Sequence, residues 1–482
     1  MSVKVYNTLT RRKEEFIPIS QGKVNMYVCG PTTYNFIHLG NARPIVVFDT
    51  IRRYFEHKGF EVKYIQNFTD IDDKIIHKAQ EEGISPLKLA EKYIREYEQD
   101  AKALYVKKAD FHPRVSNHIP EIISMIKSLL ERGHAYEVEG DVYFDVESYK
   151  DYGKLSGRSL DDLCSGARVE IDQRKKSPLD FALWKSAKPG EPAWESPWGK
   201  GRPGWHIECS AMSQKYLGVT FDVHGGGYDL VFPHHENELA QSEASTCRPF
   251  VRYWLHNGFI TINQEKMSKS TGNFFLVREI LSKYAGDVIR YFLLATHYRS
   301  PLDFDLNKLE ESQKALERIK NTLRNLYEAQ KRGPGKEVSL AGQVKDFQNK
   351  LGDFRLKLES AMDDDFNTAL AIGILFDLCR EINGAINNLG AASQFEEAMQ
   401  EAWDLLTVFT QDVLGIISVT EITGSSLDAD NDFVNGLMDI ILSIRQEARA
   451  KKDWDTSDLI RDRLQAMGIT VEDTPQGVRW RR

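Results

Sequence analysis

The chain has 482 residues, 41% of them apolar, which is enough for more than one core; domains of about 100 to 200 residues are usual, so we expect about three. The formal net charge of -8 excludes a surface that is basic throughout, so any nucleic acid must meet a local basic patch. No signal-peptide core, no run of about 18 apolar residues and an odd, scattered set of five cysteines together predict a cytoplasmic protein without a membrane partner.

Strand and helix patterns alternate at the start of the chain. Residues 24–30 and 60–70 are predicted strands, because β-branched and aromatic residues cluster there between polar or turn residues. Residues 41–59 have helical periodicity that stops at Gly59. Strand, helix and strand in this order form the βαβ unit of a parallel sheet.

Residues 120–200 change in character. A helix over 120–133 precedes short strands over 134–146 and then a loop rich in Gly, Pro, Lys and Trp, which predicts an insertion. The α/β pattern returns after it, so we expect a sheet domain that is split in two. The returning strand, helix and strand are predicted at residues 218–227, 234–246 and 254–262.

From about residue 305 the pattern is nearly all helical. Amphipathic stretches at 307–330 and 366–389 predict a helical bundle. Three aspartates at 363–365 are interpreted as a helix start rather than a metal site, and turn residues and acids at 423–432 precede a small tail. The expected domains are a split catalytic domain (1–120 and 201–265), an insertion (121–200), a loop region (266–310), a bundle (311–418) and a C-terminal region (419–482).

The sequence HLGN follows the first predicted strand and opens a helix. A helix N-terminus can hold phosphate, and Gly40 would let a nucleotide ring approach the backbone closely. His38 and Asn41 could donate hydrogen bonds to phosphate and its developing negative charge. The alternative for so short a motif is a helix cap with a satisfied histidine.

A second motif, EKMSKSTGN, occupies residues 265–273. Lys266 and Lys269 lie three apart among small and hydroxyl residues, which is typical of a mobile cationic loop. Such a loop can close over a triphosphate and neutralise pyrophosphate as it leaves. A solvated lysine pair on a surface turn is the alternative.

Four soft or acidic side chains form a third candidate group. His234 and Glu238 are four apart, so on a helix they share one face and can share a cation. Cys29 and Cys209 are expected at separate strand or loop ends. Their separation of 180 residues leaves buried structural cysteines and a histidine pair that caps a helix as the alternative.

HLGN and KMSKS together resemble the paired signatures of class I aminoacyl-tRNA synthetases, and the third group resembles the zinc site of the cysteinyl-tRNA synthetase family. The resemblance covers essentially the whole chain. It implies a split Rossmann-type parallel sheet with a connective insertion that serves the acceptor end, a helical bundle and an anticodon-binding end. It also implies one Zn²⁺ per chain at Cys29, Cys209, His234 and Glu238; ATP with Mg²⁺ and catalysis at His38, Gly40, Asn41, Lys266 and Lys269; and a substrate pocket of Thr69, Trp205, His224 and Asp229.

The implied reaction is cysteine–tRNA ligation by a monomer. L-cysteine and ATP form cysteinyl adenylate and pyrophosphate, and the cysteinyl group then passes to the 3′-terminal ribose of tRNA(Cys). A thiophilic metal can reject serine, so no editing domain is expected. The tail, residues 441–482, has nine Lys or Arg against seven Asp or Glu; Trp454 and Trp480 suit unstacked anticodon bases or, alternatively, a small helical core.

Two other functions remain to be separated from this one. A related ligase, that of the mycothiol pathway, passes the same adenylate to a small amine, but it lacks the anticodon-binding end that this tail resembles. A zinc-stabilised RNA-binding module without catalysis would not need intact HLGN and KMSKS motifs. Turnover of ATP would exclude the module.

Overall fold

The computed structural model describes residues 2–159, 173–262, 265–266, 274–331, 340–389, 395–423, 428–474 and 477–481. The chain divides into two compact units, Met1–Ser418 and Val419–Arg482. Within the residues described, no helix is long and apolar enough to cross a membrane.

The first unit is built on a four-stranded parallel sheet in the order β10-β9-β3-β4. β3 (Lys23–Val28) and β4 (Glu61–Gln66) precede the insertion, whereas β9 (Phe221–Gly227) and β10 (Val251–Asn257) follow it. α1 (Leu39–His57) makes the crossover from β3 to β4. The predicted split parallel sheet is therefore confirmed.

Local sequence explains why β3 and α1 form where they do. Met26, Tyr27 and Val28 point to alternate faces and are all fully buried, as is usual for a parallel strand covered on both faces. After α1 the backbone of Gly59 takes a φ of 85°, a left-handed conformation that ends a helix and that glycine adopts without strain.

The insertion carries a helix and an antiparallel sheet of its own. α4 (Ile119–Glu131) leads into the order β5-β6-β7-β8. β5 (Ala135–Val138) and β6 (Asp141–Phe144) confirm the strands predicted over 134–146. β7 (Phe181–Ser186) and β8 (Gly201–Pro203) were not predicted, because turn residues, lysines and prolines surround them in the sequence. Burial of Leu183 and Trp184 in the core stabilises β7 there.

The strand predicted over 254–262 is confirmed at both ends but is divided into two strands. Its first part belongs to β10, and its last part forms β11 (Ile260–Ile262) in a separate sheet of order β12-β11-β13, with β12 at Glu265–Lys266 and β13 at Leu302–Asp303. The strand is interrupted at Gly258. A Cβ atom at this position would lie 2.6 Å from the carbonyl oxygens of Arg299 and Ser300. The contacting carbonyl groups belong to a segment that is distant in the sequence, so no local sequence pattern predicts the interruption of the strand.

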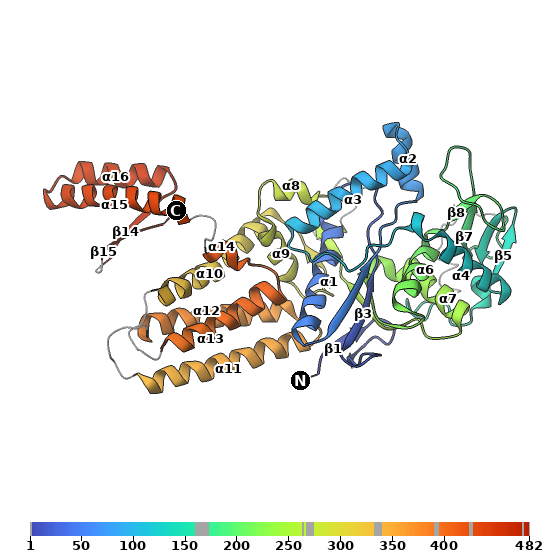
Figure 1. Ribbon diagram of the computed structural model, residues 1–482, viewed down its shortest axis with the longest axis horizontal. Helices are drawn as coiled ribbons and strands as arrows, with labels where there is room; N and C mark the ends of the chain where they lie inside the picture. Colours follow the sequence, from blue (N-terminus) through green and yellow to red (C-terminus); the bar gives the residue numbers. More distant parts are fainter. Residues whose placement is uncertain are drawn as a thin grey trace. The chain divides into compact units, whose positions relative to one another are not determined.

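The helices predicted over 307–330 and 366–389 are confirmed as α10 (Leu306–Lys331) and α12 (Thr368–Leu389). They pack with α11 (Ala341–Asp363) and α13 (Phe395–Thr407) as a bundle (Figure 1). The aspartates at 363–365 end α11 instead of starting a helix, because Asp365 accepts hydrogen bonds from the Tyr6 backbone, Tyr298 and Arg299. The other helices that bear on the sites are α2 (Asp73–Glu82), α3 (Pro86–Ala103), α8 (Val277–Leu281) and α9 (Gly286–Leu294).

The second unit is small and has its own core. It contains α14 (Val419–Thr423), α15 (Asp428–Ala450), α16 (Trp454–Ala466) and the hairpin β14 (Thr470–Thr474) with β15 (Gly477–Arg481). The break predicted over 423–432 is wrong in its second half, where the acids begin α15. Trp480 packs against the core of Met438, Leu442 and Leu464, whereas Trp454 is 57% exposed.

Candidate active site and metal centre

A cleft of about 310 Å³ lies where the four parallel strands end. Its walls include Gly30 after β3, Gln66 at the end of β4, Gly227 at the end of β9 and Asn257 at the end of β10. Ligands of open α/β sheets bind at this edge. Six of the residues predicted for the site line the cleft: Cys29, His38, Gly40, Asn41, Trp205 and Asp229.

His38 and Asn41 cap α1 reciprocally. The Nδ1 atom of His38 accepts a hydrogen bond of 3.2 Å from the Asn41 backbone, and the Asn41 side-chain oxygen accepts one of 3.2 Å from the His38 backbone. Because Nδ1 is an acceptor, the neutral ring carries its proton on Nε2, which is then a donor. The cap and the phosphate-binding role are therefore compatible, and the cap orients the donor.

The second motif is described only in part. Lys266 ends β12, where its backbone pairs with Thr261 of β11. β11 begins at Ile260, which lines the cleft. Lys269 lies outside the described residues. The structure thus brings the backbone that leads to the motif to the cleft wall.

The four predicted metal ligands meet beside the cleft. Cys29 follows β3, Cys209 lies on α6 (Trp205–Leu217), His234 lies in the turn Val231–His235, and Glu238 lies on α7 (Glu236–Thr246). The Cys29 sulfur is 3.8 Å from that of Cys209 and 3.4 Å from Glu238 Oε1, which is 2.9 Å from His234 Nε2. One ligand atom from each lies within 4.8 Å of the others. Cys209 comes from a helix, so its expected place at a strand or loop end is wrong.

A second, overlapping group of donors shares Cys29 and Glu238 and adds His224 and His235. His224 Nε2 is 2.8 Å from Glu238 Oε2, and His235 Nε2 is 3.3 Å from the Cys29 sulfur. His235 Nδ1 is in turn 2.7 Å from His256. Sequence reasoning missed His235 and His256; the only signal was the histidine doublet in FPHHEN.

Charge in the cluster is strongly redistributed. Burial opposes ionisation of Glu238, but His224 and His234 outweigh it and hold the pKa of Glu238 well below its usual value. Burial likewise opposes protonation of His234, but Glu238 outweighs it and raises the pKa of His234 to about 10. Burial raises the pKa of Cys29, whereas hydrogen bonds from Cys29 and His234 outweigh burial and lower the pKa of Cys209 to about 6. This donor set, with a thiolate and a carboxylate already favoured, suits a divalent metal cation that replaces the protons.

The four residues predicted for the substrate pocket separate into two pairs. Trp205 is 38% exposed at the cleft, and its ring lies on that of His234 at 4.2 Å; Asp229 also faces the cleft. Thr69 is buried and donates a hydrogen bond of 3.2 Å to Glu208, and His224 is buried against Glu238. Neither Thr69 nor His224 is among the residues that line the cleft.

Three protein families match the chain in succession. Residues 15–314 match the tRNA synthetases class I (C) catalytic domain, residues 357–418 the DALR domain, and residues 438–481 the cysteinyl-tRNA ligase anticodon binding domain. The succession covers both compact units.

Curated relatives match over their whole length. The cysteine–tRNA ligases of Desulforamulus reducens and Pelotomaculum thermopropionicum are each 61% identical over 100% of both chains, and that of Heliobacterium modesticaldum is 59% identical over 100% of both. Among solved structures, Mycobacterium tuberculosis methionyl-tRNA synthetase with methionyl-adenylate has a TM-score of 0.60 at 14% identity, covering 81% of this chain and 91% of that one. Agrobacterium radiobacter LeuRS also has a TM-score of 0.60, at 12% identity, covering 85% and 86%. These two likenesses concern the fold alone.

Proposed function

The chain belongs to the class I cysteinyl-tRNA synthetase family, and we propose that it is a cysteine–tRNA ligase: it joins L-cysteine to ATP as cysteinyl adenylate, releases pyrophosphate, and transfers cysteine to the 3′-terminal ribose of tRNA(Cys). One observation is the main support for this proposal. The thiol, imidazole and carboxylate cluster borders the same cleft that the capped N-terminus of α1 lines. One ligand in this cleft would therefore contact both the proposed phosphate-binding N-terminus of α1 and the proposed thiol-selective cluster.

The proposed ATP site uses the first turn of α1. The Nε2–H of His38 and the side-chain amide of Asn41 would donate to the phosphates, supported by the positive end of the helix dipole. Gly40 would admit the nucleotide without a side chain in the way. Lys266 and Lys269 would neutralise pyrophosphate as it departs, with Mg²⁺ carried in on the ATP.

The proposed metal is Zn²⁺, held by Cys29, Cys209, His234 and Glu238. Two thiols, an imidazole and a carboxylate are the donors that zinc takes in proteins, so the residues present fit the ion. When bound, zinc would supply a thiophilic Lewis acid that distinguishes the thiol of cysteine from the hydroxyl of serine. His224 would hold Glu238 in place through the contact of its Nε2 with Glu238 Oε2.

The remaining pocket residues would orient the amino acid. Asp229 faces the cleft and would pair with the substrate ammonium, and Trp205 would form a wall over His234. Thr69 is proposed to act through its hydrogen bond to Glu208, and so to position the wall instead of touching the substrate.

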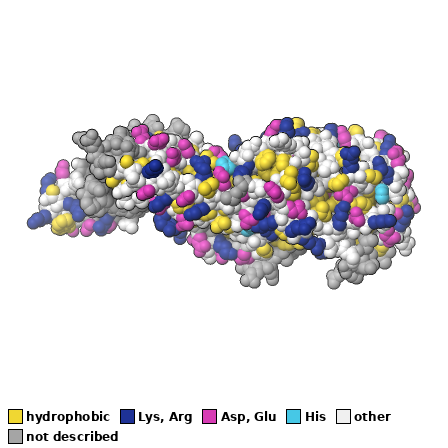
Figure 2. Space-filling view, turned by 90° about the horizontal axis from the view of Figure 1, so that it is seen from below, with side chains coloured by type: hydrophobic (Ala, Val, Ile, Leu, Met, Phe, Trp, Pro, Cys, Tyr) yellow, Lys and Arg dark blue, Asp and Glu magenta, His cyan; other side chains and the backbone are white. Residues whose placement is uncertain are grey.

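Transfer RNA as the acceptor is favoured by the match at residues 438–481. Trp454 is exposed and can stack on an unpaired base, while Trp480 is proposed to keep the small core together. On the face drawn in Figure 2, the lysine and arginine side chains of the described residues are interspersed with acids and form no continuous basic surface. We propose that the insertion 121–200 serves the acceptor end and that the chain acts as a monomer in the cytoplasm.

The first test is exchange of labelled pyrophosphate into ATP, with each amino acid offered separately and no RNA present. Exchange with cysteine and not with serine is the expected result. Exchange with no amino acid would overturn the proposal and leave an RNA-binding module. Charging of tRNA(Cys) in a second assay separates a ligase for transfer RNA from one that uses a small amine as acceptor.

A further inference from the structure

A second cavity, of about 290 Å³, lies between α1, β4 and α3, and among the described residues Gln66 is the one lining residue that it shares with the cleft. Three rings line it, those of Tyr64, Tyr97 and His112. The His112 ring is itself held in a stack on Phe68 at 4.8 Å. The volume is near the lower end of the about 300 to 1,000 Å³ of ordinary ligand pockets. Flat walls and a small volume suit one ring or two fused rings.

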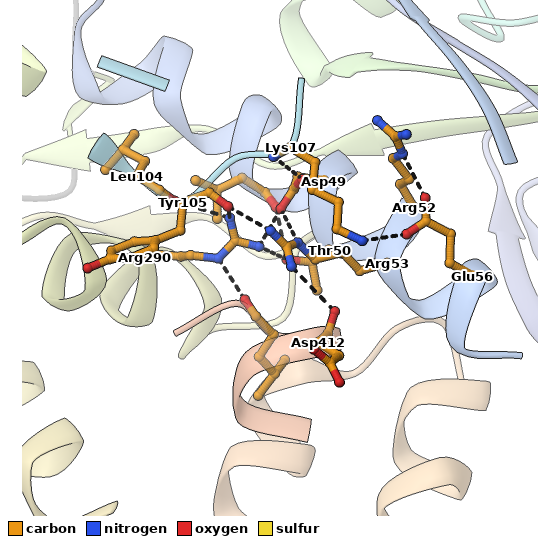
Figure 3. Close-up of polar contacts among 12 residues, drawn as sticks. Asp49, Thr50, Arg52, Arg53, Glu56, Leu104, Tyr105, Lys107, Arg290 and Asp412 are labelled. Carbon is orange, nitrogen blue, oxygen red and sulfur yellow. Dashed lines mark hydrogen bonds and ion pairs between the residues drawn. The ribbon is translucent and has the colours of Figure 1, made fainter. Parts of the chain in front are cut away.

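The basic side chains that line this cavity outnumber the acidic ones. Its acid Asp49 is already paired, at 2.7 Å with Arg53 and at 2.6 Å with Arg290 (Figure 3). Its other acid, Glu98, lies 3.7 Å from Lys108. Lys102 lies on α3, lines the cavity and is exposed. Its ammonium group forms no ion pair within the described part of the chain. An anionic group on the ligand would therefore find an ammonium that is not paired with any of the described acids.

Gln66 connects this cavity with the candidate active site, because it lines both. On the cavity side its side chain accepts a hydrogen bond from the Tyr97 hydroxyl, and its carbonyl is 2.8 Å from His112 Nδ1. On the cleft side, a Cβ atom built on Gly30 would lie 3.3 Å from the Gln66 Cγ, so the two residues are near neighbours. Gly30 directly follows Cys29, so a shift of Gln66 would reach the cluster.

We infer that the cavity between α1, β4 and α3 is a second ligand site, which takes a small, flat aromatic anion and is coupled through Gln66 to the cleft. This site goes beyond the proposed function, since cysteine, ATP and tRNA are assigned elsewhere. The ligand's ring would lie among Tyr64, Tyr97 and His112, and its anionic group would face Lys102. Its binding would change how the cleft holds its own substrates.

Calorimetric titration of the full chain with indole-3-carboxylate tests the site without any need for activity. We expect binding, and at least about tenfold weaker binding of the neutral indole-3-carboxamide, since the carboxamide lacks the negative charge that would pair with the Lys102 ammonium. Lys102→Gln should weaken binding of the carboxylate to the level of the carboxamide. Lys88→Gln, at an exposed position of the same helix, is the matched control and should leave binding unchanged.

Ala101→Trp, which fills the cavity, should abolish the titration signal. Equal binding to Ala101→Trp and wild type, or to Lys102→Gln and wild type, would overturn the site. Because Lys102 is exposed, its substitution gives a decisive answer even if the tryptophan variant does not fold.

Coupling is tested by cysteine-dependent pyrophosphate exchange with and without indole-3-carboxylate. We expect the KM for cysteine or ATP to change by at least about twofold, a coupling well within the usual range. Tyr97→Phe keeps the ring but deletes the hydroxyl bonded to Gln66, so it should keep binding and lose the KM change. A KM change that persists in Tyr97→Phe would overturn the route through Gln66, while failure of exchange itself would concern only the proposed function.

Discussion

The cysteine and histidine cluster and the ion-pair network around Asp49 both collect titratable side chains in the interior, but they satisfy them differently. In the network, Asp49 pairs with Arg53 and Arg290, whose Nε also donates to the Leu414 carbonyl at 2.6 Å (Figure 3). In the cluster, Cys29 and Glu238 contact each other, and their other described side-chain contacts are with a thiol and with imidazoles.

The difference separates a structural from a functional arrangement. In the network, arginines of the protein itself neutralise the buried Asp49 carboxylate. The network therefore joins α1 to α9 and to the turn after α13 without any ligand. In the cluster, thiol and carboxylate donors converge on one point, and the positive charge comes from protons on imidazole or from a metal ion. A buried set of donors that lacks its own fixed cation is therefore the better indicator of a binding site.

The largest expected effect is that of Cys209→Ser, which replaces a thiolate donor with a harder hydroxyl. Loss of an outer partner of a metal site already costs about 10- to 100-fold in affinity or activity, so loss of a donor should exceed that. We expect metal content, measured by mass spectrometry, and cysteine-dependent exchange to fall together. Cys247→Ser, at an exposed cysteine, is the control and should change neither. Full exchange in a metal-free Cys209→Ser protein would contradict the assignment of the cluster.

Arg290→Met tests the other side of the comparison. It leaves Arg53 as the only ion-pair partner of Asp49 among the described residues and removes a fully buried cation, and breaking a buried pair costs about 3–5 kcal/mol. We expect urea denaturation to show a loss of that order in the free energy of unfolding, with metal content unchanged in the folded fraction. The double variant Asp49→Asn with Arg290→Met should recover part of the loss. A single variant as stable as wild type would show that the network is not structural.

The site was predictable where its chemistry is local in sequence. HLGN and the spacing of His234 and Glu238 could be interpreted from neighbouring residues, and the structure brings both to the cleft region. Cys29 and Cys209 could be joined only through the family resemblance, since no spacing rule links residues so far apart. His235 and His256 remained hidden, because a buried histidine beside an apolar strand has no pattern of its own.

The fold was predictable to a similar degree. β3, α1, β4 and the bundle helices follow from apolar runs and helical periodicity. The break at Gly258 and the extra strand β7 depend on contacts with distant segments, such as the carbonyls of Arg299 and Ser300. The pairing of Asp49 with Arg290 is equally non-local.

Arg43 sharpens the comparison as a third case, a buried cation satisfied by carbonyl groups. Its guanidinium donates to Gly258 and Phe259 at 2.8 Å and to Ser300 at 2.6 Å, which ties α1 to a wall of the cleft. Lysine lacks the planar guanidinium group that donates to several carbonyls at once, so Arg43→Lys should displace that wall of the cleft. We expect exchange to fall by about 10- to 100-fold, with a higher KM for ATP and unchanged metal content. Arg95→Lys, in an exposed ion pair, is the control, and an unchanged KM for ATP would contradict this positioning role.

The smallest effect concerns acid stability. Burial disfavours the charged form of Asp49, but Arg290 and Arg53 outweigh it and hold the pKa of Asp49 below its ordinary value of 3.8. A depressed native pKa stabilises the fold above the unfolded value of about 3.9, and this contribution is lost as the pH falls through the native pKa.

Wild type should therefore exceed Asp49→Asn in unfolding free energy by a constant margin above about pH 5, and the margin should shrink below about pH 4. Urea denaturation of both proteins across this range measures it. Asp377→Asn, in an exposed pair with Arg380, should show almost no margin at any pH, because exposed pairs contribute little. A margin for Asp49→Asn that stays constant down to the lowest pH would show that its carboxylate does not need the charge of Arg290 and Arg53. The contrast between a network neutralised by the protein's own cations and a cluster of donors without them would then fail at its best-defined residue.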